Sequence, residues 1–133
     1  MKNSNKKRER VDHLIDHLWS NGYLTLSRKY GKYLPAPTPV GDYEVDAIAK
    51  YKKKVAIGLA LSDEELDDPG LISKIHVITH DKSRFSNNRI TLYLGVPNKS
   101  LIKAHMLVAT FDEETRRNIK IVTLPDSDSY PGN

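Results

Sequence analysis

The chain has 133 residues, 38% of them hydrophobic and 29% charged, proportions typical of a soluble globular protein with one core. No apolar run approaches the roughly 18–20 residues that span a bilayer, and nothing near Met1 resembles a secretion segment. The absence of cysteine excludes disulfides and thiolate metal sites, so we expect a cytoplasmic protein with no membrane partner.

The formal net charge of +4 is concentrated at the start of the chain. Residues 1–10 hold one acid and five basic residues, which leaves sixteen of the 21 basic and sixteen of the 17 acidic residues for the remainder. The five basic residues are Lys2, Lys6, Lys7, Arg8 and Arg10. We interpret residues 1–10 as a flexible basic arm, residues 11–125 as one domain and residues 126–133 as a frayed tail. Such an arm suits phosphate contacts, although solvated termini have the same composition.

A helix and a strand are predicted next. Apolar residues from Val11 to Trp19 recur with the i, i+3, i+4, i+7, i+8 spacing of one helical face, and Gly22 follows the segment. Residues 23–29 alternate and are rich in strand formers, so they predict a first strand. A glycine and three prolines after this strand predict a stiff, extended connection.

The middle of the chain predicts a hairpin of two strands. Residues 43–49 alternate as a strand does, and the acidic side chains of Asp42, Glu44 and Asp46 share one face. The apolar run 55–61 is typical of a strand buried on both faces. We expect these strands to pair around a turn that contains four lysines, Lys50, Lys52, Lys53 and Lys54.

Helices and strands alternate in the second half. Ser62 and Glu65 have capping-box spacing, which predicts the start of a helix that is interrupted by proline and glycine and resumes over residues 71–79. Residues 89–96 alternate as a fourth strand, Asn98 is a candidate cap for a helix carrying Leu101 to Ala109, and residues 119–124 form a fifth strand. The order αβββαβαβ predicts an α/β fold, a mixed central sheet of about five strands flanked by helices.

The segment from Gly41 to Ala49, Gly-Asp-Tyr-Glu-Val-Asp-Ala-Ile-Ala, resembles the Glu-Ile-Asp-Leu-Ile-Ala motif of the restriction-endonuclease-like, or PD-(D/E)XK, nuclease superfamily. That superfamily includes archaeal Holliday-junction resolvases, and the resemblance covers about residues 8–97. It implies that Asp46 occupies the position of a metal ligand, with Glu44 beside it on the same face. The two are vestigial catalytic candidates.

The resemblance also implies residues that this chain lacks. The third strand should carry Glu-X-Lys where Gly58-Leu59-Ala60 stand, and the family's helix glutamate falls on Val11. Phosphodiester cleavage needs divalent cations held by several oxygen ligands, and a lysine to orient the attacking water. Three of the four family positions are therefore empty, which indicates a degenerate active site.

Some members of the superfamily place the missing carboxylate on the following helix. Asp63, Glu64 and Glu65 open that helix here, so an active site with Mg²⁺ would use Asp46, Glu64 and Glu65. Glu65 is already explained by the capping box, however, and acids in a first helical turn are favoured by the helix dipole.

Three functions remain open. The preferred hypothesis is a catalytically inactive nuclease-fold protein that needs no cofactor and binds nucleic acid or a partner protein. The candidate nucleic-acid contacts are Lys6, Lys7, Arg8, Arg10, Lys52, Lys53 and Lys54. The second hypothesis is a divergent Mg²⁺-dependent endonuclease that uses Asp46, Glu44 and a carboxylate from the following helix. The third is a protein-interaction domain, supported by the neutral body and the acidic run at 63–68.

Tyrosines gather around the first strands. They are Tyr23, Tyr30, Tyr33, Tyr43 and Tyr51. Beside Arg28, Lys29 and Lys32, exposed rings of this kind suit the stacking of bases, whereas buried ones would cap the core.

Overall fold

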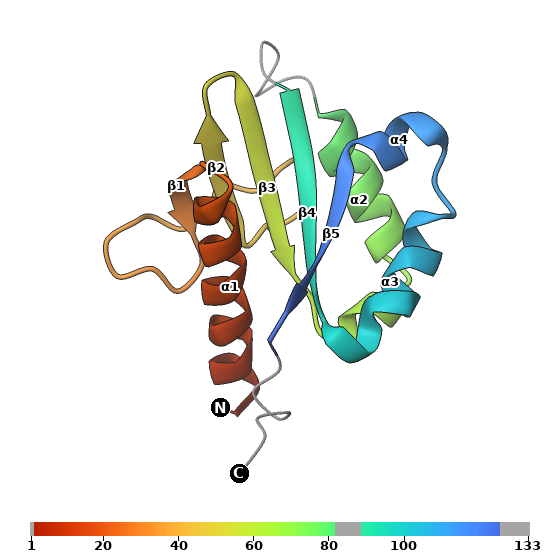
Figure 1. Ribbon diagram of the computed structural model, residues 1–133, viewed down its shortest axis with the longest axis horizontal. Helices are drawn as coiled ribbons and strands as arrows, with labels where there is room; N and C mark the ends of the chain where they lie inside the picture. Colours follow the sequence, from red (N-terminus) through yellow and green to blue (C-terminus); the bar gives the residue numbers. More distant parts are fainter. Residues whose placement is uncertain (1, 82–88, 126–133) are drawn as a thin grey trace.

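The structure is a computed structural model that describes residues 2–81 and 89–125 (Figure 1). Its elements are, in chain order, α1 (Lys2–Ser20), β1 (Leu24–Arg28), β2 (Ala47–Tyr51), β3 (Lys54–Ala60), the 3₁₀ turn η1 (Glu65–Asp67), α2 (Leu71–His80), β4 (Arg89–Pro97), the 3₁₀ turn η2 (Asn98–Ser100), α3 (Leu101–Val108), α4 (Glu113–Arg117) and β5 (Ile119–Leu124). The predicted order of helices and strands is present, with α4 added.

The strands form one open sheet in the order β1-β2-β3-β4-β5. The first three strands pair antiparallel, and β3, β4 and β5 pair parallel. Strand β3 lies at the centre and is buried at every position after Lys54, as its apolar sequence predicts. The prediction of a mixed central sheet flanked by helices is confirmed.

Helices cover both faces of the sheet (Figure 1). Helix α1 packs on one face through Val11, Leu14 and Leu18, which are fully buried. Helices α2, α3 and α4 pack on the other face, where Ile75 and Ile78 of α2 belong to a larger core. The i, i+3, i+7 spacing of the α1 residues is the pattern that predicted this helix.

Two local predictions are confirmed. The hairpin between β2 and β3 turns at Lys52 and Lys53, and Lys52 has a φ of 55°. In the capping box, the Ser62 amide donates to Glu65 Oε1 at 2.9 Å and the Glu65 amide donates to Ser62 Oγ at 3.1 Å. The capped segment is only the single turn η1, and α2 begins after Pro69-Gly70.

Two boundaries and one element differ from the predictions. Residues 2–10 were expected to form an arm outside the domain, but they are the first half of α1. Strand β2 begins at Ala47 rather than at residue 43, and Val40 and Tyr43 before it form an isolated bridge. Helix α4 was not predicted, since five residues are too few to show a helical period.

The proposed frayed tail at 126–133 lies outside the described residues. Within the described part of the chain, no helix is both long enough and apolar enough to cross a bilayer.

Candidate functional site

Asp46, which the sequence singled out, lies immediately before β2 and is only 3% exposed. Backbone hydrogen bonds hold it on both sides: its amide donates to the Gly58 carbonyl, and its carbonyl accepts from the Lys29 amide, both at 2.9 Å. Its carboxylate oxygen Oδ2 accepts a hydrogen bond from the Ala60 amide at 2.8 Å. The carboxylate is therefore fixed beside the end of β3.

The ammonium group of Lys7 occupies the space next to this carboxylate. Lys7 Nζ donates to Asp46 Oδ2 at 3.0 Å and to the Ala60 carbonyl oxygen at 2.5 Å, and it lies 3.5 Å from Glu65 Oε2. Lys7 precedes Val11 by one helical turn, so it continues the face of α1 that packs on the sheet. Oxygen atoms from three separate segments thus converge on one ammonium group.

Of the three acids that open the segment after β3, only Glu65 joins this cluster. Its capping box with Ser62 fixes its backbone, and Arg10 NH2 lies 3.7 Å from its Oε1. Glu64 is exposed, and within the described residues its side chain has no partner. Asp63 turns away and accepts a hydrogen bond from Ser100 at 2.8 Å.

The acidic run at 63–68 is partly paired inside the fold. Lys103 Nζ lies 3.2 Å from an oxygen of Asp63 and 3.0 Å from an oxygen of Asp67. The hydrogen bonds from Ser100 and Lys103 lower the pKa of Asp63. These acids therefore attach η1 to α3, which weakens the case that the run is a partner-binding surface.

Two further lysines surround Asp46. Lys29 Nζ lies 3.6 Å from Asp46 Oδ1 and 3.2 Å from Oε1 of Glu44, whose side chain is 73% exposed. Burial lowers the pKa of Lys29, but the charge of Asp46 and the hydrogen bond with Glu44 outweigh burial, so the net shift is upward. For Lys74 of α2, burial is the dominant influence and its pKa is lowered despite the charge of Asp46.

The cluster therefore has more cations than anions. Its cations are Lys7, Arg10, Lys29 and Lys74, and its acids are Asp46, Glu44 and Glu65. Within residues 2–81 and 89–125, no group of three His, Cys, Asp or Glu side chains is placed to hold a metal ion. Because its carboxylates are paired with lysine and arginine side chains, this arrangement is an ion-pair network built around the buried Asp46.

The three remaining positions implied by the nuclease resemblance belong to the core. Val11 and Ala60 are fully buried against the sheet and α1. Gly58 faces the same helix: a Cβ atom there would lie 2.7 Å from Leu14 Cδ2. A glutamate at position 58 would therefore have to displace a core leucine.

The basic residues suggested as nucleic-acid contacts separate into three groups. Lys7 and Arg10 point to the acids of the cluster, and Lys6 lies beside them on α1, partly buried. Arg8 is exposed and stands over the Tyr30 ring, 5.7 Å from its centroid. The hairpin lysines at positions 52, 53 and 54 are exposed at the opposite end of β3, about 20 Å away at the usual rise of a strand.

Sequence reasoning did not place Lys29 or Lys74 beside Asp46. A signal for Lys74 was present, because it stands three residues after Leu71 and four before Ile78, inside the apolar stripe of α2. A lysine in such a stripe needs a partner, and the structure places Lys74 near Asp46. Lys29 follows the last residue of β1 and gave no comparable signal.

Comparisons of the chain with protein-family models, with curated proteins and with solved structures found no match. Function is therefore inferred from the site itself.

Proposed function

We propose that this chain is a restriction-endonuclease-like protein in which a lysine has replaced the metal site, and that it binds nucleic acid without cutting it. The fold part of the proposal is supported by the order of elements: α1, an antiparallel β1-β2-β3 meander, α2, then β4 parallel to β3. Asp46 stands at the start of the second strand, where the resemblance puts a metal ligand.

The contacts of Lys7 support the proposal that the protein does not cleave nucleic acid. Two carboxylates and a backbone carbonyl, all oxygen donors of the kind that bind Mg²⁺, contact the Lys7 ammonium group instead. An ammonium neutralises one charge and satisfies the oxygens through its N–H donors. It cannot lower the pKa of a bound water or polarise a phosphate as a divalent cation does.

Nucleic-acid binding is supported by the basic groups that lie outside this cluster. Lys7 and Arg10 have internal partners, so phosphate contacts fall to the exposed Arg8 and to the lysines of the β2–β3 hairpin. Exposed cations attract phosphates chiefly by releasing condensed counterions.

Salt-dependent binding is the test of this function. Labelled single-stranded and duplex oligonucleotides should bind the purified protein, with affinity falling between about 50 and 200 mM salt and a logarithmic slope of about 0.7–0.9 per phosphate contacted. Lys120→Ala, which removes an exposed lysine on the distant edge strand β5, is the control and should not change the slope. Absence of binding at low salt, or binding that salt does not weaken, would refute the function.

A divergent metal-dependent nuclease is the second candidate, and one observation favours it. Glu65 and Asp46 both contact Lys7 Nζ, so the carboxylate expected from the following helix does lie beside Asp46. A metal ion could use both carboxylates only if Lys7 left its place. Metal-dependent cleavage by the wild-type protein would therefore favour this candidate over the inactive one.

A further inference from the structure

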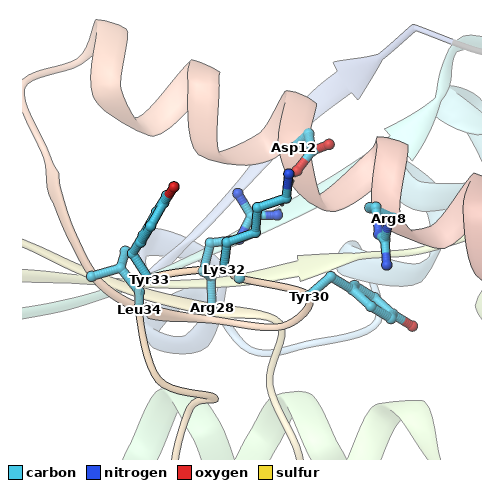
Figure 2. A pocket seen from close by; sticks show the side chains of 8 residues that line it. Arg8, Asp12, Arg28, Tyr30, Lys32, Tyr33 and Leu34 are labelled. Atoms are coloured by element: carbon cyan, nitrogen blue, oxygen red, sulfur yellow. Dashed lines mark hydrogen bonds and ion pairs between the residues drawn. The ribbon is translucent and has the colours of Figure 1, made fainter.

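A pocket of about 520 Å³ opens between the first half of α1 and the loop that follows β1 (Figure 2). Its volume is within the range of small-ligand sites. It is separate from the Asp46 cluster, with which it shares no lining residue. The lining residues are Arg8, Asp12, Arg28, Tyr30, Gly31, Lys32, Tyr33 and Leu34.

The loop that forms the floor of the pocket is closed on itself. The Arg28 amide donates to the Pro35 carbonyl at 2.9 Å. Gly31 permits a close approach, because a Cβ atom there would lie 2.9 Å from the Leu34 carbonyl oxygen. Tyr30 adopts a φ of 61°, a conformation that a bulky residue seldom takes and that clusters at functional sites. The fold thus holds Tyr30 in a strained conformation that presents its ring beside Arg8.

The cations of the pocket are not equivalent. Arg28 is an ion-pair partner of Asp12, and its Nε donates to the Lys29 carbonyl at 3.1 Å. Its guanidinium is therefore held in place by contacts within the protein. Within residues 2–81 and 89–125, the structure gives neither Arg8 nor Lys32 an acidic partner, and both side chains are exposed. These two are therefore the groups that can receive a phosphate.

Aromatic rings lie beside these cations. Figure 2 shows Tyr33 and Tyr30 toward opposite ends of the pocket, with Arg28 and Lys32 between them and Arg8 extending from α1 toward Tyr30. Tyr33 is 95% exposed, so its ring gains almost nothing from the core of the free protein. An exposed ring beside unpaired cations is the combination that binds the bases and phosphates of a single strand.

We propose that this pocket binds a short stretch of single-stranded nucleic acid, with a base stacked on Tyr33 and neighbouring phosphates held by Lys32 and Arg8. The inference deepens the proposed function and rests on it. Bases in a duplex are stacked on their neighbours and cannot reach Tyr33, so the pocket selects for single strands.

The test compares one labelled single-stranded oligonucleotide with the duplex of the same sequence. Tyr33→Ala should weaken single-strand binding by about five- to 150-fold and leave duplex binding unchanged. Lys32→Ala should lower the salt slope for the single strand by about 0.7. Trp19→Ala is the matched control, since Trp19 is also an exposed aromatic residue, but it lies outside the pocket; it should bind as the wild type does.

The outcomes distinguish a failure of the pocket proposal from a failure of the proposed nucleic-acid binding. Single-strand binding that survives Tyr33→Ala and Lys32→Ala, but is lost in Lys53→Ala, would overturn the pocket and leave the proposed function standing. Absence of any binding by the wild type would overturn both. The last experiment adds a free nucleoside monophosphate as a competitor of the labelled single strand. If it displaces the single strand when the two are at equal concentration, the assignment of the pocket to single-stranded nucleic acid is overturned. Tyr33 is too exposed for its truncation to unfold the protein, and an unchanged unfolding curve should confirm this.

Discussion

The missing side chain of Gly58 lets Leu14 of helix α1 pack directly on strand β3. Gly58 pairs with Ala47 across the sheet, and the small residues on both strands leave room for the helix. The position at which the nuclease resemblance expects a glutamate is therefore committed to packing. Restoring a carboxylate there would place a charge against a buried leucine.

We predict that Gly58→Ala lowers the free energy of unfolding by about 1–3 kcal/mol, because the new methyl group overlaps Leu14 in a filled core. Urea denaturation measures the loss. Gly70→Ala is the control, since a Cβ atom at position 70 meets only Asp68 Oδ1 at an ordinary 3.5 Å. In a Leu14→Ala background the Gly58 substitution should cost much less. Equal free energies of unfolding for Gly58→Ala and Gly70→Ala would contradict the packing explanation.

Helix α1 is longer than its apolar stripe indicates. Its apolar stripe begins at Val11, so the basic residues before it were interpreted as an arm. The helix continues to Lys2, and the next residue on the stripe is Lys7, whose partner Asp46 lies 39 residues away. When the buried face of a helix continues with a charged residue, the sequence shows this only if the oppositely charged partner is known.

We predict that Lys7→Ala lowers the free energy of unfolding by about 1–3 kcal/mol, because the buried Asp46 carboxylate would lose its closest cation. The variant should also gain a response to Mn²⁺. With the ammonium removed, Asp46, Glu65 and the Ala60 carbonyl can share a cation, and binding to the folded state raises the unfolding midpoint. Thermal unfolding with and without millimolar Mn²⁺ measures both effects.

Lys53→Ala, an exposed substitution in the hairpin, is the control for Lys7→Ala and should change neither stability nor the response to Mn²⁺. A Lys7→Ala protein as stable as the wild type would show that the contacts of Lys7 contribute no energy. A wild-type protein stabilised by Mn²⁺ to the same extent would show that Lys7 does not compete with metal.

At the scale of the whole molecule, the sheet was predictable and the site only in part. Each strand carries its own period, and β3 carries an apolar run that only a central strand tolerates, so the class and order of elements follow from local sequence. Asp46 was found from the motif around it. Lys7, Lys29 and Lys74 come from three separate elements, and the fold alone brings them together.

We propose that the site filled by Lys7 does not support metal-dependent cleavage, and a nuclease assay on the wild-type protein tests this proposal. Labelled branched, single-stranded and duplex substrates are incubated with Mg²⁺ or Mn²⁺, with Asp46→Ala protein alongside. We predict that every substrate stays intact, because Lys7 occupies the oxygen atoms that a cation would need. Cleavage that requires the metal and disappears in Asp46→Ala would refute the inactive site and identify the chain as an active nuclease.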